Sequence, residues 1–136
     1  MNKDIFVYGT LKRGHHNNLL LEDSRYIGTA KTEQKFMMVG VGFPHTFLSS
    51  DINKEEDDSF LTVMGEVYEV TNPEVLKRLD WLEGVDHKHY YHFVTSVVME
   101  DGSDRQVTMY VTHPDNFGGH DSGEYLGTVV GDSYSW

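Results

Sequence analysis

Short apolar and alternating stretches of this chain predict six β-strands. They cover residues 5–8, 26–32, 36–39, 60–70, 90–99 and 106–112. In the longest stretch the side chains alternate around Gly65, which marks either a bulge or a close approach of another backbone. Asp101 and Gly102 lie between the last two stretches, and this pair is typical of a hairpin turn.

The segment after the longest strand predicts a helix, because its apolar positions repeat at helical spacing. Thr71 or Asn72 can cap its start, Pro73 suits its first turn, and Gly84 is placed to end it. A second, shorter helical turn is predicted over residues 16–23. The buried stripe of the longer helix consists of Val75, Leu76, Leu79 and Leu82.

The remaining segments carry polar or mixed patterns. Residues 40–44 predict a loop, and residues 49–59 predict a solvated acidic loop. Residues 113–136 are rich in Gly, Ser and Asp, and predict no defined element. Their apolar residues either pack across the sheet or belong to a partly mobile tail; these are Tyr125, Leu126, Val129 and Val130. Since no repeat or linker is visible, we expect a single domain over residues 1–136.

Composition narrows the class of protein. With 38% hydrophobic and 24% charged residues, the chain is neither disordered nor an integral membrane protein. We expect no signal peptide, since Asn2, Lys3 and Asp4 run directly into the first strand, and the absence of cysteine is compatible with a reducing compartment, so we expect a cytoplasmic protein. A net charge of −11 disfavours nucleic acid as a partner, and no membrane partner is expected.

The turn after the first strand is the first candidate site. Gly9 stands where the strand ends, and a residue without Cβ allows positive φ and a close approach of a ligand. Successive backbone N–H groups in such a turn can form a small anion-binding concavity. A plain strand-exit turn is the alternative. The spacing from Gly9 to Gly14 is that of a P-loop, but His15 and His16 follow where Lys and Ser or Thr are required. The sequence therefore does not predict nucleotide binding.

Glu83 is the second candidate. It continues the apolar stripe and falls in the last turn of the predicted helix, where burial and the helix dipole both raise the pKa of a carboxyl group. Such a group is a candidate acid/base, unless the helix frays and the carboxylate lies in water. His87, His89 and His92 form a histidine-rich patch, but no further ligand stands at convincing spacing, so we expect no metal.

Two sequence motifs follow one another along the chain. F-V-Y-G-T-L-K-R-G covers residues 6–14, and L-D-W-L-E-G-V covers residues 79–85. With the long strand, Tyr90 and the strand ending near Val111, they closely resemble the gamma-glutamylcyclotransferase-like family, above all its gamma-glutamylamine cyclotransferase branch. The resemblance covers about residues 4–112. It implies an α+β fold, a small mixed β-barrel flanked by short helices.

The resemblance also implies a reaction, the cyclisation of a gamma-glutamyl amine to 5-oxoproline with release of the amine and without a cofactor. It assigns substrate binding to Tyr8, Gly9, Thr10 and Leu11, and catalysis to Glu83. Tyr90 would line the pocket. His92 departs from the family, which commonly has Arg near this position. The alternative is a non-catalytic binding module for a small gamma-glutamyl-like ligand; a metal-dependent hydrolase using the histidine patch is less favoured.

Overall fold

The structure is a computed structural model, and it describes residues 3–8, 21, 24–40, 44–52, 55–56, 60–85, 89–114, 128–130 and 133–135. These residues form nine strands and one α-helix. In chain order they are β1 (Lys3–Val7), β2 (Arg25–Thr32), β3 (Phe36–Gly40), β4 (Pro44–Phe47), β5 (Phe60–Val70), α1 (Pro73–Leu82), β6 (Tyr90–Met99), β7 (Asp104–Thr112), β8 (Thr128–Val130) and β9 (Ser133–Ser135).

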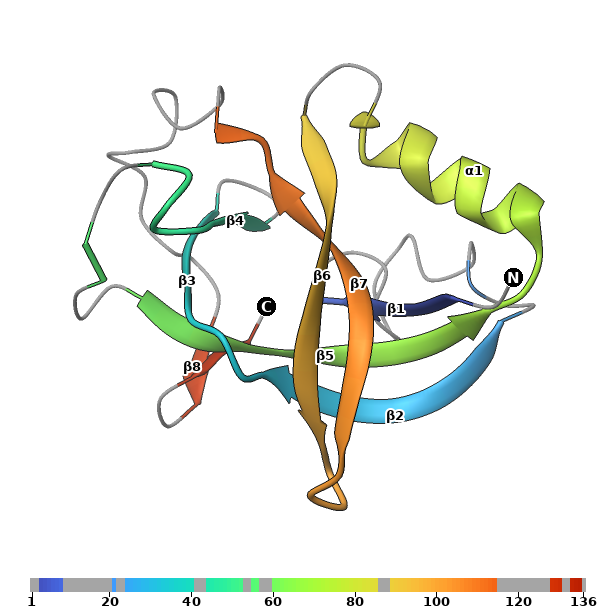
Figure 1. Ribbon diagram of the computed structural model, residues 1–136, viewed down its shortest axis with the longest axis horizontal. Helices are drawn as coiled ribbons and strands as arrows, with labels where there is room; N and C mark the ends of the chain where they lie inside the picture. Colours follow the sequence, from blue (N-terminus) through green and yellow to red (C-terminus); the bar gives the residue numbers. More distant parts are fainter. Residues whose placement is uncertain are drawn as a thin grey trace.

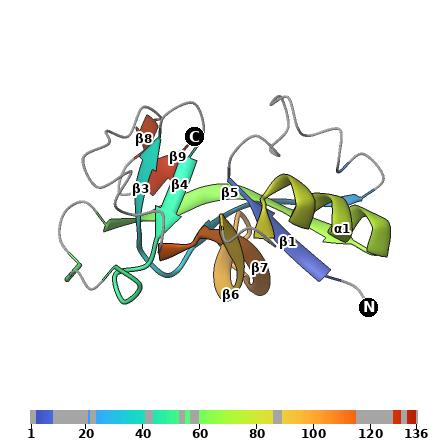
Figure 2. The same cartoon turned by 90° about the horizontal axis from the view of Figure 1, so that it is seen from above.

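Five strands close into a barrel. They pair in the order β1-β7-β6-β2-β5, and β5 pairs back with β1. The β1–β7 pair is parallel and the other four pairs are antiparallel. The β6–β7 hairpin crosses β5 and β2 in Figure 1, whereas β3, β4 and β8 gather on the side away from α1 (Figures 1 and 2). The predicted α+β fold with a small mixed β-barrel is confirmed.

Helix α1 begins and ends as its sequence predicts. The Asn72 side chain caps it by accepting a hydrogen bond from the backbone N–H of Glu74 at 3.0 Å, and Pro73 is the first helical residue. Val75 and Leu79 are buried, with Leu76 and Leu82 packed partly buried beside them. Both ribbon views place α1 over β1 and the C-terminal half of β5 (Figures 1 and 2).

Two apolar clusters follow from the period of two along the strands. The first draws side chains from all five barrel strands, including Phe6, Val67 and Met109, and fills the barrel. The second lies between the barrel and α1 and includes Ile5 and Leu79. Because both faces of β1 and β5 meet apolar partners, these two strands are buried on both sides.

Gly65 marks a close backbone approach, one of the two readings of its position in β5. A Cβ atom there would lie 2.3 Å from the carbonyl oxygen of Val7 and 2.7 Å from the ring of Phe6. The bulge in β2 instead falls between Tyr26 and Gly28. Gly65 therefore allows β1 to seat against β5 where the barrel closes.

Three short strands were not predicted. β4 starts at Pro44, within the expected 40–44 loop, and pairs with β3 so that Phe47 faces Met37. β8 and β9 come from the segment that had no assigned element, and β9 runs parallel to β5. Val129 thus lies in a strand, while Tyr125 and Leu126 fall outside the described residues. Strands of three or four residues are too short for a period of two to identify them.

Candidate active site

The C-terminal end of α1 fixes the position of Glu83. Glu83 is the C-cap residue, and its backbone N–H donates to the carbonyl oxygen of Leu79 at 2.9 Å. Gly84 follows with φ of +63°, a left-handed conformation that ends the helix at little cost only for a residue without Cβ. A Cβ on Gly84 would also lie 2.7 Å from Nδ1 of His89. The backbone is therefore closely constrained on both sides of Glu83.

The carboxyl group of Glu83 is withdrawn from water although the residue as a whole is only half-buried. Burial raises its pKa from 4.5 to about 7. Among the described residues, no side chain donates a hydrogen bond to this carboxyl. The burial of the carboxyl does not fit the alternative of a solvated carboxylate beyond a frayed helix, and a pKa of about 7 lies in the range that suits a general acid/base.

Three buried tyrosines sense the charge of Glu83. Tyr8 follows β1, Tyr90 begins β6, and Tyr110 lies in β7. Burial is the main reason that the pKa of each phenol is raised, and the Glu83 carboxylate adds to the rise in all three. Its charge can act on all three only if it lies close to them, so the helix end, β1 and the β6–β7 hairpin meet at one place.

The hydroxyl of Tyr8 is held by two partners. It donates to the backbone carbonyl oxygen of Tyr110 at 2.5 Å and lies 2.8 Å from Oγ1 of Thr46. Because a hydroxyl carries a single proton, the Thr46 hydroxyl donates to Tyr8. The backbone N–H of Thr46 donates to Oγ1 of Thr112 at 3.1 Å. The unpredicted strand β4 is thereby tied to β7 directly beside Tyr8.

His45 is a second residue of β4 that sequence reasoning missed. Its ring stacks on Tyr90 with the planes 10° apart and the centroids at 5.9 Å. Nδ1 of His45 lies 3.3 Å from the Tyr90 hydroxyl. The apolar pair Phe47 and Leu48, after a β-branched Thr46, was the one available signal for this strand.

Asp80 and His92 form a further pair at the end of α1. Oδ1 of Asp80 accepts hydrogen bonds from the Tyr110 hydroxyl at 2.6 Å and from Nε2 of His92 at 2.7 Å. His92 and Tyr110 are directly opposite each other on β6 and β7. His92, noted for its departure from the family pattern, is thus engaged with the helix that carries Glu83.

The sequence of this chain matches a known family over most of its length. The family model described as gamma-glutamyl cyclotransferase, AIG2-like, matches residues 5–127. The chain belongs to the gamma-glutamylcyclotransferase family. The predicted family membership is confirmed.

Individual members agree with this assignment. A Methanocaldococcus jannaschii protein named "putative gamma-glutamylcyclotransferase" is 33% identical over 116 residues, which cover 84% of this chain and 87% of that protein. The gamma-L-glutamyl-butirosin B gamma-glutamyl cyclotransferase of Niallia circulans is 28% identical over 119 residues, covering 84% of this chain and 69% of that one. The crystal structure of an AIG2-like protein from Mus musculus superposes with a TM-score of 0.67 at 28% identity, covering 83% of this chain and 78% of that chain.

The gamma-glutamylcyclotransferase fold brings together three of the residues that the sequence singled out, namely Tyr8, Glu83 and Tyr90. Gly9, Thr10 and Leu11 lie outside the described residues, as does His87 of the histidine patch. In the part of the chain that the structure describes, no three His, Cys, Asp or Glu side chains are grouped so that they could hold a metal ion.

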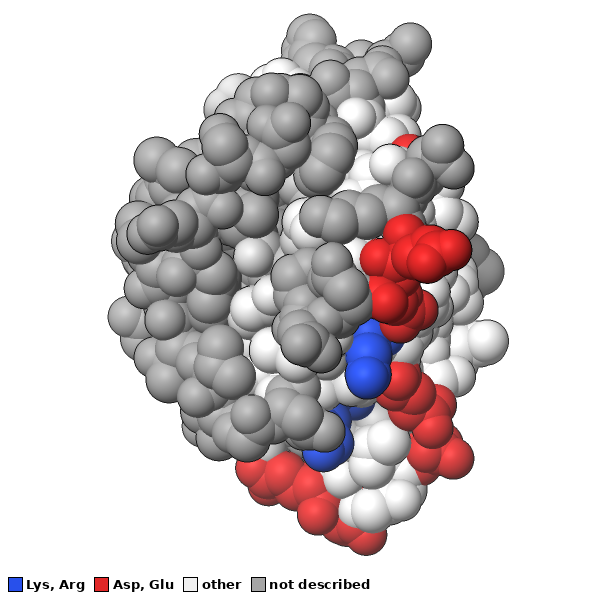
Figure 3. All heavy atoms as spheres, turned by 90° about the vertical axis from the view of Figure 1, so that its left-hand side faces the viewer, with Lys and Arg blue, Asp and Glu red and all other residues white. Residues whose placement is uncertain are grey.

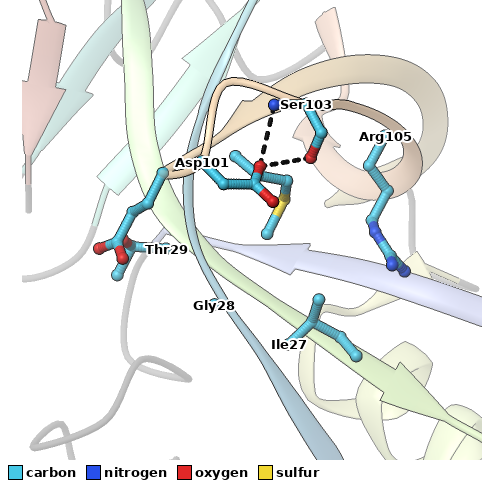
Figure 4. A pocket seen from close by; sticks show the side chains of 8 residues that line it. Ile27, Gly28, Thr29, Asp101, Ser103 and Arg105 are labelled. Atoms are coloured by element: carbon cyan, nitrogen blue, oxygen red, sulfur yellow. Dashed lines mark hydrogen bonds between the residues drawn. The ribbon is translucent and has the colours of Figure 1, made fainter.

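A separate hollow lies between β2 and the β6–β7 hairpin (Figure 4). Several of its polar groups bond to one another. Asp101 accepts from the backbone N–H of Ser103 at 2.9 Å and from its hydroxyl at 2.5 Å, which lowers the pKa of Asp101, and the Thr29 hydroxyl donates to Glu100. The hollow shares no residue with the group around Glu83, so the family's reaction is not assigned to it. It is lined by Ile27, Gly28, Thr29, Met99, Glu100, Asp101, Ser103 and Arg105.

The surface of this gamma-glutamylcyclotransferase family member reflects its net charge of −11. On the face seen in Figure 3, Asp and Glu side chains cover more of the described surface than Lys and Arg do. No helix within the described ranges has the length and apolar character needed to span a bilayer.

Proposed function

We propose that this protein converts a gamma-glutamyl amine to 5-oxoproline and a free amine, with Glu83 as general acid/base. The observation that carries the proposal is the buried Glu83 carboxyl with a pKa of about 7, close to Tyr8 and Tyr90 in a member of this family. A group that titrates near neutral pH can both accept and return a proton.

In the proposed reaction, Glu83 alone carries the protons from the attacking nitrogen to the leaving nitrogen. The α-ammonium group of the glutamyl moiety gives a proton to the Glu83 carboxylate, and its nitrogen then attacks the γ-carbonyl carbon. The new C–N bond closes a five-membered ring, and the bond to the amine breaks as Glu83 returns the proton to the leaving nitrogen. The ring nitrogen then gives its second proton, through Glu83, to the released amine, which leaves as an ammonium ion. Because the attack is intramolecular, holding the folded conformer removes much of the barrier. Backbone N–H groups of residues 9–11 would bind the glutamyl carboxylate.

The charge of the protein supports an amine rather than an amino acid as the leaving group. A net charge of −11 attracts cations and repels anions. A gamma-glutamyl polyamine or aminoglycoside carries positive charge beyond the glutamyl head, whereas a gamma-glutamyl amino acid carries an additional carboxylate. The name of the Niallia circulans relative gives gamma-L-glutamyl-butirosin B as its substrate, which supports a gamma-glutamyl conjugate of this kind.

The test is release of 5-oxoproline from matched substrates. We expect turnover of gamma-glutamyl-putrescine or a gamma-glutamyl aminoglycoside in preference to gamma-glutamyl-alanine. Glu83→Gln keeps the shape of the side chain and removes the base, so it should lower kcat by at least about a hundredfold. Glu74→Gln, an exposed change on the same helix, is the matched control.

Two outcomes would contradict the proposal. Near wild-type 5-oxoproline formation by the Glu83→Gln variant would rule out this mechanism. Saturable binding of a gamma-glutamyl amine without any product, by a folded wild-type protein, would instead identify a binding module.

A further inference from the structure

The proton of each hydroxyl near Glu83 can be traced where the structure shows its acceptor. Tyr8 donates to the carbonyl oxygen of Tyr110, and Tyr110 donates to Oδ1 of Asp80. Since a phenol has one proton, neither residue has one to give to Glu83. Two potential donors therefore lie near the carboxyl and are both directed elsewhere.

Their positions at the end of one helix place both Asp80 and Glu83 near Tyr110. They are three positions apart at the end of α1, a spacing that puts two side chains on the same side of a helix. Tyr110 packs in the cluster between this helix and the barrel and senses the charge of both carboxylates. Its hydroxyl is bonded to Asp80 at 2.6 Å.

From this geometry we propose that Asp80 is a positioning residue that holds the Tyr110 hydroxyl away from Glu83. The inference rests on the proposed role of Glu83 as a base. A hydrogen bond to a carboxylate stabilises its charged form and lowers its pKa, so a donated bond from Tyr110 would weaken Glu83 as a base at neutral pH. Asp80 prevents this by taking the proton itself.

His92 is a second hydrogen-bond partner of Asp80. Its Nε2 lies 2.7 Å from the same Oδ1 atom, and its ring packs against that of Tyr110 with centroids 5.3 Å apart. His92 and Tyr110 therefore bond to Asp80, whereas Tyr8, Tyr90 and Tyr110 sense the charge of Glu83. His92 keeps the Asp80 carboxylate oriented toward Tyr110.

The test compares two substitutions of Asp80 by carboxyl-selective NMR titration. Glutamate labelled at the side-chain carboxyl carbon reports the pKa of Glu83, and its signal is assigned by its absence in Glu83→Gln. Asp80→Asn keeps an oxygen that accepts from Tyr110 and removes the charge, whereas Asp80→Leu removes the acceptor as well. We expect the pKa of Glu83 to fall by about one unit more in Asp80→Leu than in Asp80→Asn.

Two further variants make the result decisive. Adding Tyr110→Phe to Asp80→Leu removes the released donor and should return the pKa of Glu83 to the Asp80→Asn value. Tyr110→Phe alone should leave the pKa of Glu83 unchanged, because its hydroxyl is not donated to Glu83 in the native protein, and this arm decides the question if Asp80→Leu does not fold.

Equal pKa values for Glu83 in Asp80→Leu and Asp80→Asn, or a rise of about one unit in Tyr110→Phe alone, would overturn the inference. The titration needs no substrate, so its outcome is separate from the activity of Glu83→Gln, on which the proposed function depends.

Discussion

The Tyr8 hydroxyl donates a hydrogen bond to the backbone carbonyl oxygen of Tyr110, 102 positions later in the chain, across 2.5 Å. β1 and β7 are parallel neighbours in the barrel, so this bond adds a side-chain link just past the point where their ladder ends. It also fixes the direction of the Tyr8 proton and leaves the oxygen to accept from Thr46. One hydroxyl, through two hydrogen bonds, thus joins the end of β1 to both β7 and β4.

Removing this hydroxyl should destabilise the protein. Tyr8→Phe leaves the Tyr110 carbonyl and the Thr46 hydroxyl each short of a buried partner, and we expect a loss of about 1–3 kcal/mol in the free energy of unfolding. Urea unfolding measures this loss. A double-mutant cycle with Thr46→Val should give a coupling energy above about 0.5 kcal/mol, and strict additivity would show that the two hydroxyls do not interact.

The sequence anticipated the parts of this site that arise from local pattern. The stripe of α1, its cap and the glycine after Glu83 all follow from spacing within one helix, so the position of Glu83 at the helix end could be predicted. The closed barrel could be expected only through the family resemblance. The alternation of side chains along a strand indicates which face of the sheet each residue occupies, but not the order in which the strands pair.

The partners of the tyrosines could not be read from the sequence. His45 and Thr46 lie in a four-residue strand that carries too few positions for a period of two. Asp80 appeared in the sequence only as part of the motif over residues 79–85, because its bond to Tyr110 depends on how the end of α1 packs against the β6–β7 hairpin. Contacts of this kind are set by tertiary packing, on which local pattern carries no information.

The closure of the barrel at Gly65 should tolerate no side chain. Gly65→Ala would place Cβ 2.3 Å from the carbonyl oxygen of Val7, and backbone cannot move aside as a flexible side chain can. We expect a loss of about 3 kcal/mol in the free energy of unfolding, measured by urea denaturation. Gly102→Asn is the control, since its φ of +87° is acceptable to Asn and nothing lies within 4 Å of the added Cβ. Equal stability of the two variants would contradict the close approach.

The glycine after Glu83 should matter for turnover as well as for stability. Gly84→Ala combines a residue with Cβ at φ of +63° with a contact of 2.7 Å to the ring of His89. Relief of both requires the helix end to shift, so we expect about 1–2 kcal/mol lower stability together with a fall in kcat. Stopped assays of 5-oxoproline release at a temperature where the variant is folded separate the two effects. Unchanged kcat would show that Glu83 does not depend on this turn.

Burial of Glu83 should make stability depend on pH. The folded protein keeps a proton on Glu83 up to about pH 7, whereas the ordinary pKa is 4.5, so the folded state binds more protons between these values and stability falls as pH rises through them. Glu83→Gln lacks this penalty. Its free energy of unfolding should therefore rise relative to that of the wild type between pH 4.5 and 7, by up to about 3 kcal/mol. The difference should persist at higher pH. Urea denaturation at pH 4.5 and 8 measures the difference, and Glu74→Gln should show no such trend.

The same titration should appear in the kinetics. Because the proposed base must be ionised to accept a proton, kcat/KM for a gamma-glutamyl amine should decline about tenfold per pH unit below a pKa near 7. Glu66→Gln removes another buried carboxyl group and should leave the decline of kcat/KM at low pH unchanged. This control shows that the decline comes from Glu83 and not from any buried carboxyl group. An acid limb near pH 4.5 in wild type would mean that the ionisation governing turnover is not that of a buried Glu83.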